Sequence, residues 1–277
     1  MFARLWNKRK SDKQSTDSQM PQTYTQQRGN SARAAEIRAQ AQLPSDLEKL
    51  QSLLNSEGEM NQQEMAWAHG VISEQPPEQQ DSLYLKLQEK TPYANQRDND
   101  SVWRGVDNLA DQMCNLTALA MCLQYLGVPK PTNVTPPVGE TVDSMQYEDA
   151  LFQLWMQLGK PGKNIIYATA WQAICTELGR TGEKVSFDGK KSSWESVVRD
   201  QYLAKGHGVM VGGFGHVVRV QAVNENGVIV DDPFGKSTGP KKSWSEKNTK
   251  QEDGQAGNDS EWVWPNEKGG LYLFHVK

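Results

Sequence analysis

Two runs of β-branched residues on either side of Asn226-Gly227 constrain the fold of this chain most strongly. The first run is HVVRVQAV, residues 216–223, and the second is GVIVDDPFG, residues 227–235. Asn-Gly between two such runs is a strong signal for a β-hairpin. Since residues 209–214 and 270–276 also have the composition of strands, we expect the C-terminal part of the chain to form an antiparallel sheet.

Helical patterns precede this sheet along the chain. Apolar residues recur at helical spacing after Cys114, and further helical patterns cover residues 144–158, 168–178 and 194–204. An order of helices first and antiparallel strands afterwards is typical of an α+β fold. We therefore predict an α+β domain that spans residues 91–277.

The first 43 residues differ in composition from the rest of the chain. They contain eight Lys/Arg and three Asp/Glu, a net charge of +5, so residues 44–277 carry −4 − 5 = −9. Seven glutamines and few large apolar side chains give this segment too little surface to bury, and we predict a disordered basic tail over residues 1–43. The tail could dock on a partner, a membrane face or a delivery machine, or it could be a solvated extension.

Residues 44–90 have the pattern of short amphipathic helices. A leucine stripe follows Pro44 and stops at Gly58, a second pattern starts near Asn61, and a third starts after Pro76-Pro77. We predict that the second helix ends at Gly70, because glycine commonly follows the last helical residue. Residues 44–90 are thus expected to form a helical prefix that packs on the domain.

Composition and simple motifs exclude several classes of protein. No apolar run approaches the roughly 20 residues that cross a bilayer. Three cysteines are too few for a disulfide scaffold, and a net charge of −4 gives no strong attraction to nucleic acid. The chain has no paired CxxC motifs, HExxH helix or phosphate-binding loop, so we expect neither a metal nor an organic cofactor.

Cys114 has the position of a reactive thiol. It lies at the predicted start of a helix, where free backbone N–H groups and the positive end of the helix dipole favour a thiolate. The alternative is that Cys114 is a small buried residue, as Cys122 and Cys175 are expected to be within their helices.

A nucleophilic cysteine requires a base, and His216 is the best placed of the four histidines. It begins a strand in which Val218, Val220 and Ala222 are expected to share its face. The other histidines, His69, His207 and His275, lie outside such a context.

The hairpin brings the strand end at Asp231-Asp232 toward His216, on a diagonal that needs a short bulge or splay. An acid there would orient the imidazole. Either aspartate could serve, and we favour Asp232 because it directly precedes Pro233. For an oxyanion, the donors could be the Cys114 backbone N–H and the side-chain amide of Gln96, Asn99, Asn108 or Gln112.

Four segments in one order resemble a known family. TPYANQRDN, MCNLTALAMCLQYLG, GHGVMVGGFGHVVRV and GVIVDDPFG are similar to motifs of papain-like cysteine peptidases, in the branch of bacteriocin-leader-processing (double-glycine) peptidases. The resemblance spans about residues 91–277 and implies a papain-like fold. It implies these roles: Cys114 as nucleophile, His216 as base, Asp232 as its orienting acid and Gln96 as the oxyanion-hole side chain.

Two departures from the family pattern concern the same site. Asn115 stands where the family has glycine, beside the thiol. The interval of 18 residues between Gln96 and Cys114 is long, so that Asn108, six residues before Cys114, rivals Gln96.

The function that the resemblance implies is hydrolysis of peptide or amide bonds through a thioester intermediate. Expected substrates are proteins, leader peptides or peptidoglycan stem peptides. A bacterial effector or toxin would fit the basic tail and helical prefix. We expect it in the cytoplasm of the producing cell, with export needing no cleaved signal peptide, and with a delivery machine or an inhibitor protein as partner. The alternatives are an acyltransferase or deamidase on the same scaffold, and a non-catalytic interaction protein, which Asn115 favours.

Overall fold

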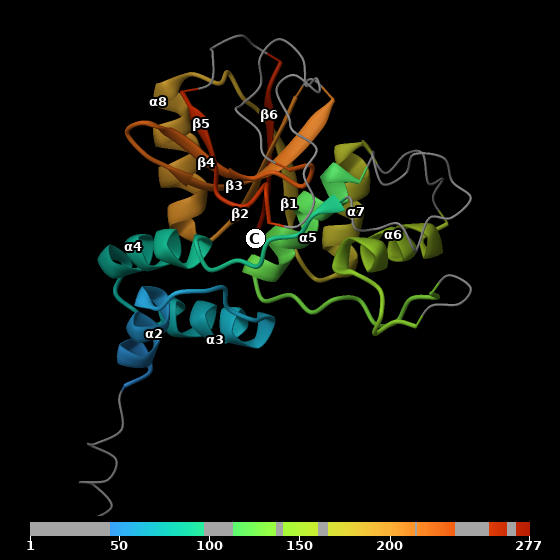
Figure 1. Cartoon of the computed structure of the whole chain (residues 1–277), viewed down its shortest axis with the longest axis horizontal. Coiled ribbons are helices and arrows are strands. Elements are labelled where there is room, and N and C mark those ends of the chain that lie inside the picture. The colour runs from blue at the N-terminus through green and yellow to red at the C-terminus, as the bar shows by residue number, and fades with distance from the viewer. Residues whose placement is uncertain are drawn as a thin grey trace, which may run out of the picture. The chain divides into compact units, whose positions relative to one another are not determined.

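A computed structural model describes residues 45–96, 113–136, 141–159, 166–213, 215–235, 255–264 and 270–277. Asp46–Lys277 form one compact unit, in which helices lead and an antiparallel sheet follows (Figure 1). This confirms the α+β class. The predicted tail 1–43 lies outside the described residues, and the boundary between a prefix and a domain at residue 90 stays a prediction.

The helices lie where the apolar periodicity predicts them, with shifted ends in several cases. Within the helical pattern predicted over residues 194–204, residues 194–202 form a π-helix. The helical elements are α2 (Asp46–Asn55), α3 (Gln62–Ser73), α4 (Pro77–Gln88), α5 (Cys114–Tyr125), α6 (Tyr147–Gln157), α7 (Ala168–Glu177), α8 (Lys191–Ser193), the π-helix η4 (Trp194–Tyr202) and the 3₁₀-helix η5 (Leu203–Lys205). None of these helices is both long enough and apolar enough to cross a membrane.

Helix α3 shows how tertiary packing overrides a local stop signal. It begins with a capping box, in which the Asn61 side chain accepts from the Glu64 backbone N–H and the Glu64 side chain accepts from that of Asn61. It then continues past Gly70 to Ser73, so the predicted end at Gly70 is wrong. Val71 and Ile72 are buried in the core, and their burial outweighs the cost of about 1 kcal/mol for a glycine inside a helix.

The described strands form one antiparallel sheet in the order β1-β6-β2-β3-β4-β5. Two of them, β1 and β5, were not expected from the sequence, because each is short and rich in charged or exposed residues. The strands are β1 (Gly182–Ser186), β2 (Gly208–Gly213), β3 (His216–Val223), β4 (Gly227–Asp231), β5 (Ser260–Val263) and β6 (Tyr272–Val276).

The sheet has a hydrophobic core on each face. Helix α5 packs on β2 and β3, where Val217 belongs to the core that also includes α2–α7. The π-helix η4 packs on the same strands, and its Trp194 and Val198 join the valines of β2–β4 in the second core. Cys114 and His216 are thus carried by elements in direct contact, α5 and β3.

The hairpin at Asn226-Gly227 contains a bulge. Val223 pairs with Val228 beside the turn, whereas Arg219 pairs with Asp231 farther along, with the register shift between Val220 and Ala222. The shift moves Ala222 off the face of His216, and the expectation that it shares this face is wrong. One extra residue in one strand reverses which side chains point to each face beyond it.

Candidate active site

Cys114 is the first residue of α5, directly after Met113. The helix is apolar on all sides and buried along most of its length, as expected for a helix in the centre of a core. Both the backbone N–H and the hydroxyl of Thr117 donate to Met113 O, at 2.9 and 3.0 Å, and they fix the first turn. The core therefore holds the sulfur at a helix N-terminus.

The His216 ring lies between an acid and the thiol. Its Nε2 is 2.7 Å from Asp232 Oδ1, and the Cys114 side chain lies within hydrogen-bonding reach of the ring. Asp232 Oδ1 additionally accepts from the Phe234 backbone N–H at 2.9 Å, and the Phe234 ring meets His216 edge-on. His216 and Asp232 are both buried, so little water competes for these bonds.

Two opposing effects determine the charge of His216. Burial lowers its pKa, because a buried imidazolium loses hydration. The negative charges of Asp232 and Cys114, together with the hydrogen bonds to both, outweigh burial and raise the pKa to about 10. At neutral pH the His216 ring is therefore an imidazolium.

The bulge in β3 decides which aspartate meets His216. Continuing the register of Val223 and Val228 without a bulge would place Asp231 opposite Val220, on the face of His216. With the bulge, Asp231 lies opposite Arg219 and forms a buried ion pair with it. Burial raises the pKa of Asp231, and Arg219 counteracts this. Asp232, one residue on, takes the place beside His216.

Cys114 and His216 line a common cavity of about 350 Å³. One wall is aromatic, because the rings of Trp171 and Tyr272 stack with centroids 6.2 Å apart. Burial, with a smaller contribution from the charge on Cys114, raises the pKa of Tyr272 to about 12, so its hydroxyl stays protonated. The other lining residues are Asn115, Ile166, Gly213, Gly215, Val217 and Gly270.

Of the four candidate side-chain donors to the oxyanion, one lies among the described residues. Gln96 is fully buried, and its backbone N–H donates to Pro233 O at 2.8 Å, directly after Asp232. Gln96 does not line the cavity of Cys114. Its rivals Asn99, Asn108 and Gln112 lie outside the described residues, so the choice among them stays open.

The remaining cysteines and histidines have other environments. Cys122 and Cys175 are buried, and burial raises the pKa of each to about 12, which disfavours the thiolate. His207 and His275 approach each other, with their Nδ1 atoms 3.2 Å apart. His69 is in ring contact with Tyr84 and Tyr125. His275 Nε2 lies 3.7 Å from Oε2 of the largely exposed Glu183, a longer contact than the 2.7 Å between His216 and Asp232.

Several residues of this region were not singled out from the sequence. The cavity residues Ile166, Trp171 and Tyr272 read as ordinary helix and strand residues, and only tertiary contacts bring them to Cys114. The sequence also gives no sign of a role for Tyr93, which lies inside the TPYANQRDN segment. Its hydroxyl donates to Asp232 O at 2.7 Å. In the described part of the chain, no three His, Cys, Asp or Glu side chains are grouped so as to hold a metal ion.

Comparison with known proteins gives one match. A model of the Peptidase_C39-like family matches residues 88–256, which is more than half of the chain and includes Cys114, His216 and Asp232. No curated protein and no solved structure matches the chain. The resemblance drawn from the four sequence motifs is thereby confirmed at the level of the family.

Proposed function

Because this chain belongs to the Peptidase_C39-like family of cysteine peptidases, we propose that Cys114, His216 and Asp232 are its catalytic residues. One observation carries the proposal: His216 Nε2 lies 2.7 Å from Asp232 Oδ1, and the same ring lines a cavity with Cys114, whose side chain is within hydrogen-bonding reach. This is the relation of nucleophile, base and orienting acid that thiol acyl transfer requires.

The first half of the reaction forms a thioester. The Cys114 sulfur, whose proton lies on His216, attacks the carbonyl carbon of a peptide bond. As the tetrahedral intermediate collapses, the carbon–nitrogen bond breaks and the His216 imidazolium gives its proton to the leaving amine. The ring is then neutral, and Asp232 keeps its Nε2 side oriented.

The second half regenerates the enzyme. Neutral His216 takes a proton from water, and the resulting hydroxide attacks the thioester carbon. The carbon–sulfur bond breaks, a carboxylic acid leaves, and the thiolate and imidazolium are restored. The backbone N–H of Cys114 and the side chain of Gln96 are the proposed donors to the oxyanion in both halves.

The cavity indicates a peptide substrate in an extended conformation. Gly215, where a Cβ would have nothing within 4 Å, leaves room for a backbone close to the thiol, while Tyr272 and the half-exposed Ile166 offer apolar surface to one side chain. We extend the proposal to leader peptides, proteins or peptidoglycan stem peptides as substrates, and to a role as a bacterial effector or toxin. A secretion assay of the tagged full chain tests the latter role.

The first prediction concerns the nucleophile. The Cys114→Ala variant is expected to lose all cleavage of a degenerate peptide mixture, measured by mass spectrometry, with its melting temperature close to that of the parent. Iodoacetamide is expected to label Cys114 at neutral pH at least about tenfold faster than Cys122 or Cys175, since both are buried with pKa values raised to about 12.

The product masses separate this reaction from its alternatives. Hydrolysis adds one water to a cleaved peptide, deamidation leaves the chain intact with a gain of one dalton, and transfer to an amine releases ammonia or a new conjugate. Cleavage by Cys114→Ala at the parental rate would contradict the proposed nucleophile. Equal labelling of the three cysteines would favour a non-catalytic interaction protein.

A further inference from the structure

The segment of residues 88–96, which begins at the last residue of α4, is attached to the strand end that carries Asp232. Its first attachment is Arg219, a fully buried side chain of β3. The Arg219 guanidinium donates to Gln88 O and Gln88 Oε1, both at 2.8 Å, and to Thr91 Oγ1 at 2.7 Å. The same guanidinium forms the ion pair with Asp231, so it joins α4 to β4.

Two further attachments flank Asp232 itself. The Tyr93 hydroxyl donates to Asp232 O at 2.7 Å, and the Gln96 backbone N–H donates to Pro233 O at 2.8 Å. The segment is thus linked to Asp231 through Arg219, to Asp232 through the Tyr93 hydroxyl and to Pro233 through the Gln96 backbone.

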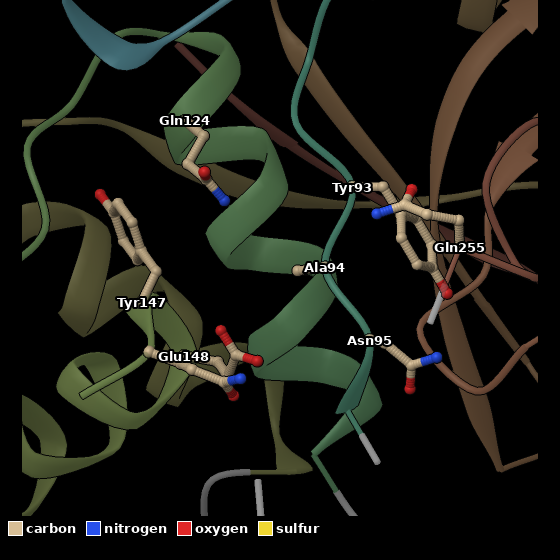
Figure 2. A pocket seen from close by; sticks show the side chains of 8 residues that line it. Tyr93, Ala94, Asn95, Gln124, Tyr147, Glu148 and Gln255 are labelled. Carbon is tan, nitrogen blue, oxygen red and sulfur yellow. The ribbon is translucent and has the colours of Figure 1, made fainter. Parts of the chain in front are cut away.

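This mostly buried segment also borders a cavity. Tyr93, Ala94 and Asn95 line a cavity of about 270 Å³ together with residues of α5 and the start of α6. Figure 2 shows the Tyr93 side chain turned away from α5, toward the loop of Gln255. The hydrogen bonds to the Asp232 strand end add to those that hold the segment elsewhere, in which the Tyr93 N–H donates to Glu59 Oε1 at 3.1 Å and the Ala94 N–H to Met121 Sδ at 3.4 Å.

The backbone of Asp232 is held from a second direction by Gly257. The Asp232 N–H donates to Gly257 O at 3.0 Å. A Cβ at Gly257 would lie 2.0 Å from Asp232 O and 2.4 Å from Tyr93 Oη, distances that only glycine avoids. The Tyr93 hydroxyl, Asp232 O and Gly257 are in close contact, so a displacement of Tyr93 is transmitted to Asp232.

We propose that Tyr93 is a positioning residue for Asp232. In this proposal residues 88–96, bound to Arg219, hold Gln96 and Asp232 at a fixed position relative to His216. This inference rests on the proposed function, because it assigns Tyr93 its role through Asp232. The Asp232 carboxylate can meet His216 Nε2 at 2.7 Å only if its own backbone is held. Tyr93 supplies one of the bonds that hold it.

The experiment compares two tyrosine-to-phenylalanine variants of the full chain. Tyr93→Phe removes the bond to Asp232 O, whereas the matched control, Tyr147→Phe, removes a hydroxyl that donates to Val128 O at 2.9 Å. Both tyrosines are 9% exposed, so the two variants lose similar buried bonds. The readout is the rate at which iodoacetamide labels Cys114 from pH 5.5 to 9, with the melting temperature of each variant.

Tyr93→Phe is expected to slow labelling near pH 6.5 by about threefold or more and to move the profile to higher pH, since a loosened Asp232 supports the His216 imidazolium less well. Tyr147→Phe is expected to keep the parental profile at a similar loss of melting temperature. A Tyr93→Phe profile equal to the parent's would overturn the role of Tyr93. If Asp232→Asn slowed labelling at the same time, the proposed catalytic residues would stand. If Asp232→Asn had no effect either, both proposals would fail.

Discussion

The four histidines of this chain show how strongly surroundings decide the chemistry of one residue type. His69 and His207 are partly buried and His275 is buried, and burial is the main cause that lowers the pKa of each to about 4. His216 is buried as well, yet Asp232 and Cys114 raise its pKa to about 10. The nearest charges thus separate a proton-carrying ring from three neutral ones.

A second prediction concerns this difference. In Asp232→Asn the neutral amide cannot balance the cost of burial, and the pKa of His216 is expected to fall by about 1–3 units. An NMR titration of the His216 Cε1–H signal measures the change. The signals of His207 and His275 in the same spectra are the internal reference and should not move. An unchanged His216 titration would mean that the charge of Asp232 does not support the imidazolium.

Part of the candidate site can be predicted from single residues in the sequence, and part of it cannot. A cysteine at a helix start and a histidine at a strand start are local features, so Cys114 and His216 could be predicted. The sequence favours Asp232 over Asp231 because it precedes Pro233, but it leaves both possible, and the bulge before Ala222 decides between them. The position of Tyr93 opposite Asp232, far away in the chain, had no local signal either.

At the scale of elements, the helix that carries Cys114 is fixed at both ends. Its first turn is held at Met113, and its C-terminal Gly127 lies against α3. Gly127 has a φ of +64°, and a Cβ there would lie 2.5 Å from the Cα and N of Ala66. The close approach of two backbones, and not only the left-handed conformation, requires glycine at this position.

The third prediction separates the effect of the left-handed conformation from that of the close backbone approach by comparing two glycines, Gly127 and Gly179. Gly179 follows α7 with a φ of +69° and has nothing within 4 Å of a Cβ. Gly179→Ala is expected to lower the free energy of unfolding by about 1 kcal/mol, the cost of the left-handed conformation alone. Gly127→Ala is expected to lower it by about 1–3 kcal/mol more, because α3 must also shift.

Urea denaturation of both variants measures the difference. Equal losses in the free energy of unfolding would show that α3 shifts at little cost to make room for the added methyl group. The contact between α3 and α5 would then not depend on Gly127.

At the scale of the whole molecule, titration of the buried histidines makes stability depend on pH. The pKa values of His69, His207 and His275 are about 4 in the folded chain, against an ordinary value of 6.5. Below pH 6.5 the unfolded chain binds protons that the folded chain does not, so stability falls as pH falls toward 4. His216 acts in the opposite sense: its contribution is present below pH 6.5 and is lost as pH rises toward 10.

The fourth prediction is a stability maximum near neutral pH. Between pH 6.5 and 5, each of the three histidines is expected to lower the ratio of folded to unfolded chain by up to about tenfold per pH unit. Urea unfolding at pH 7, 6 and 5 measures the decline, and His69→Gln should make it shallower by removing one titrating group. A flat profile from pH 7 to 5 would contradict the lowered pKa values.

The sequence by itself determined the class of fold, the family and two of the residues proposed for catalysis, because periodicity, caps and the Asn-Gly turn act over a few residues. Only the tertiary structure decided that α3 continues through Gly70, that β1 and β5 join the sheet, and that Asp232 and not Asp231 meets His216. Each of these outcomes depends on burial or register between segments distant in the chain. Such contacts are worth more free energy than the local preference they override, and no local pattern records them.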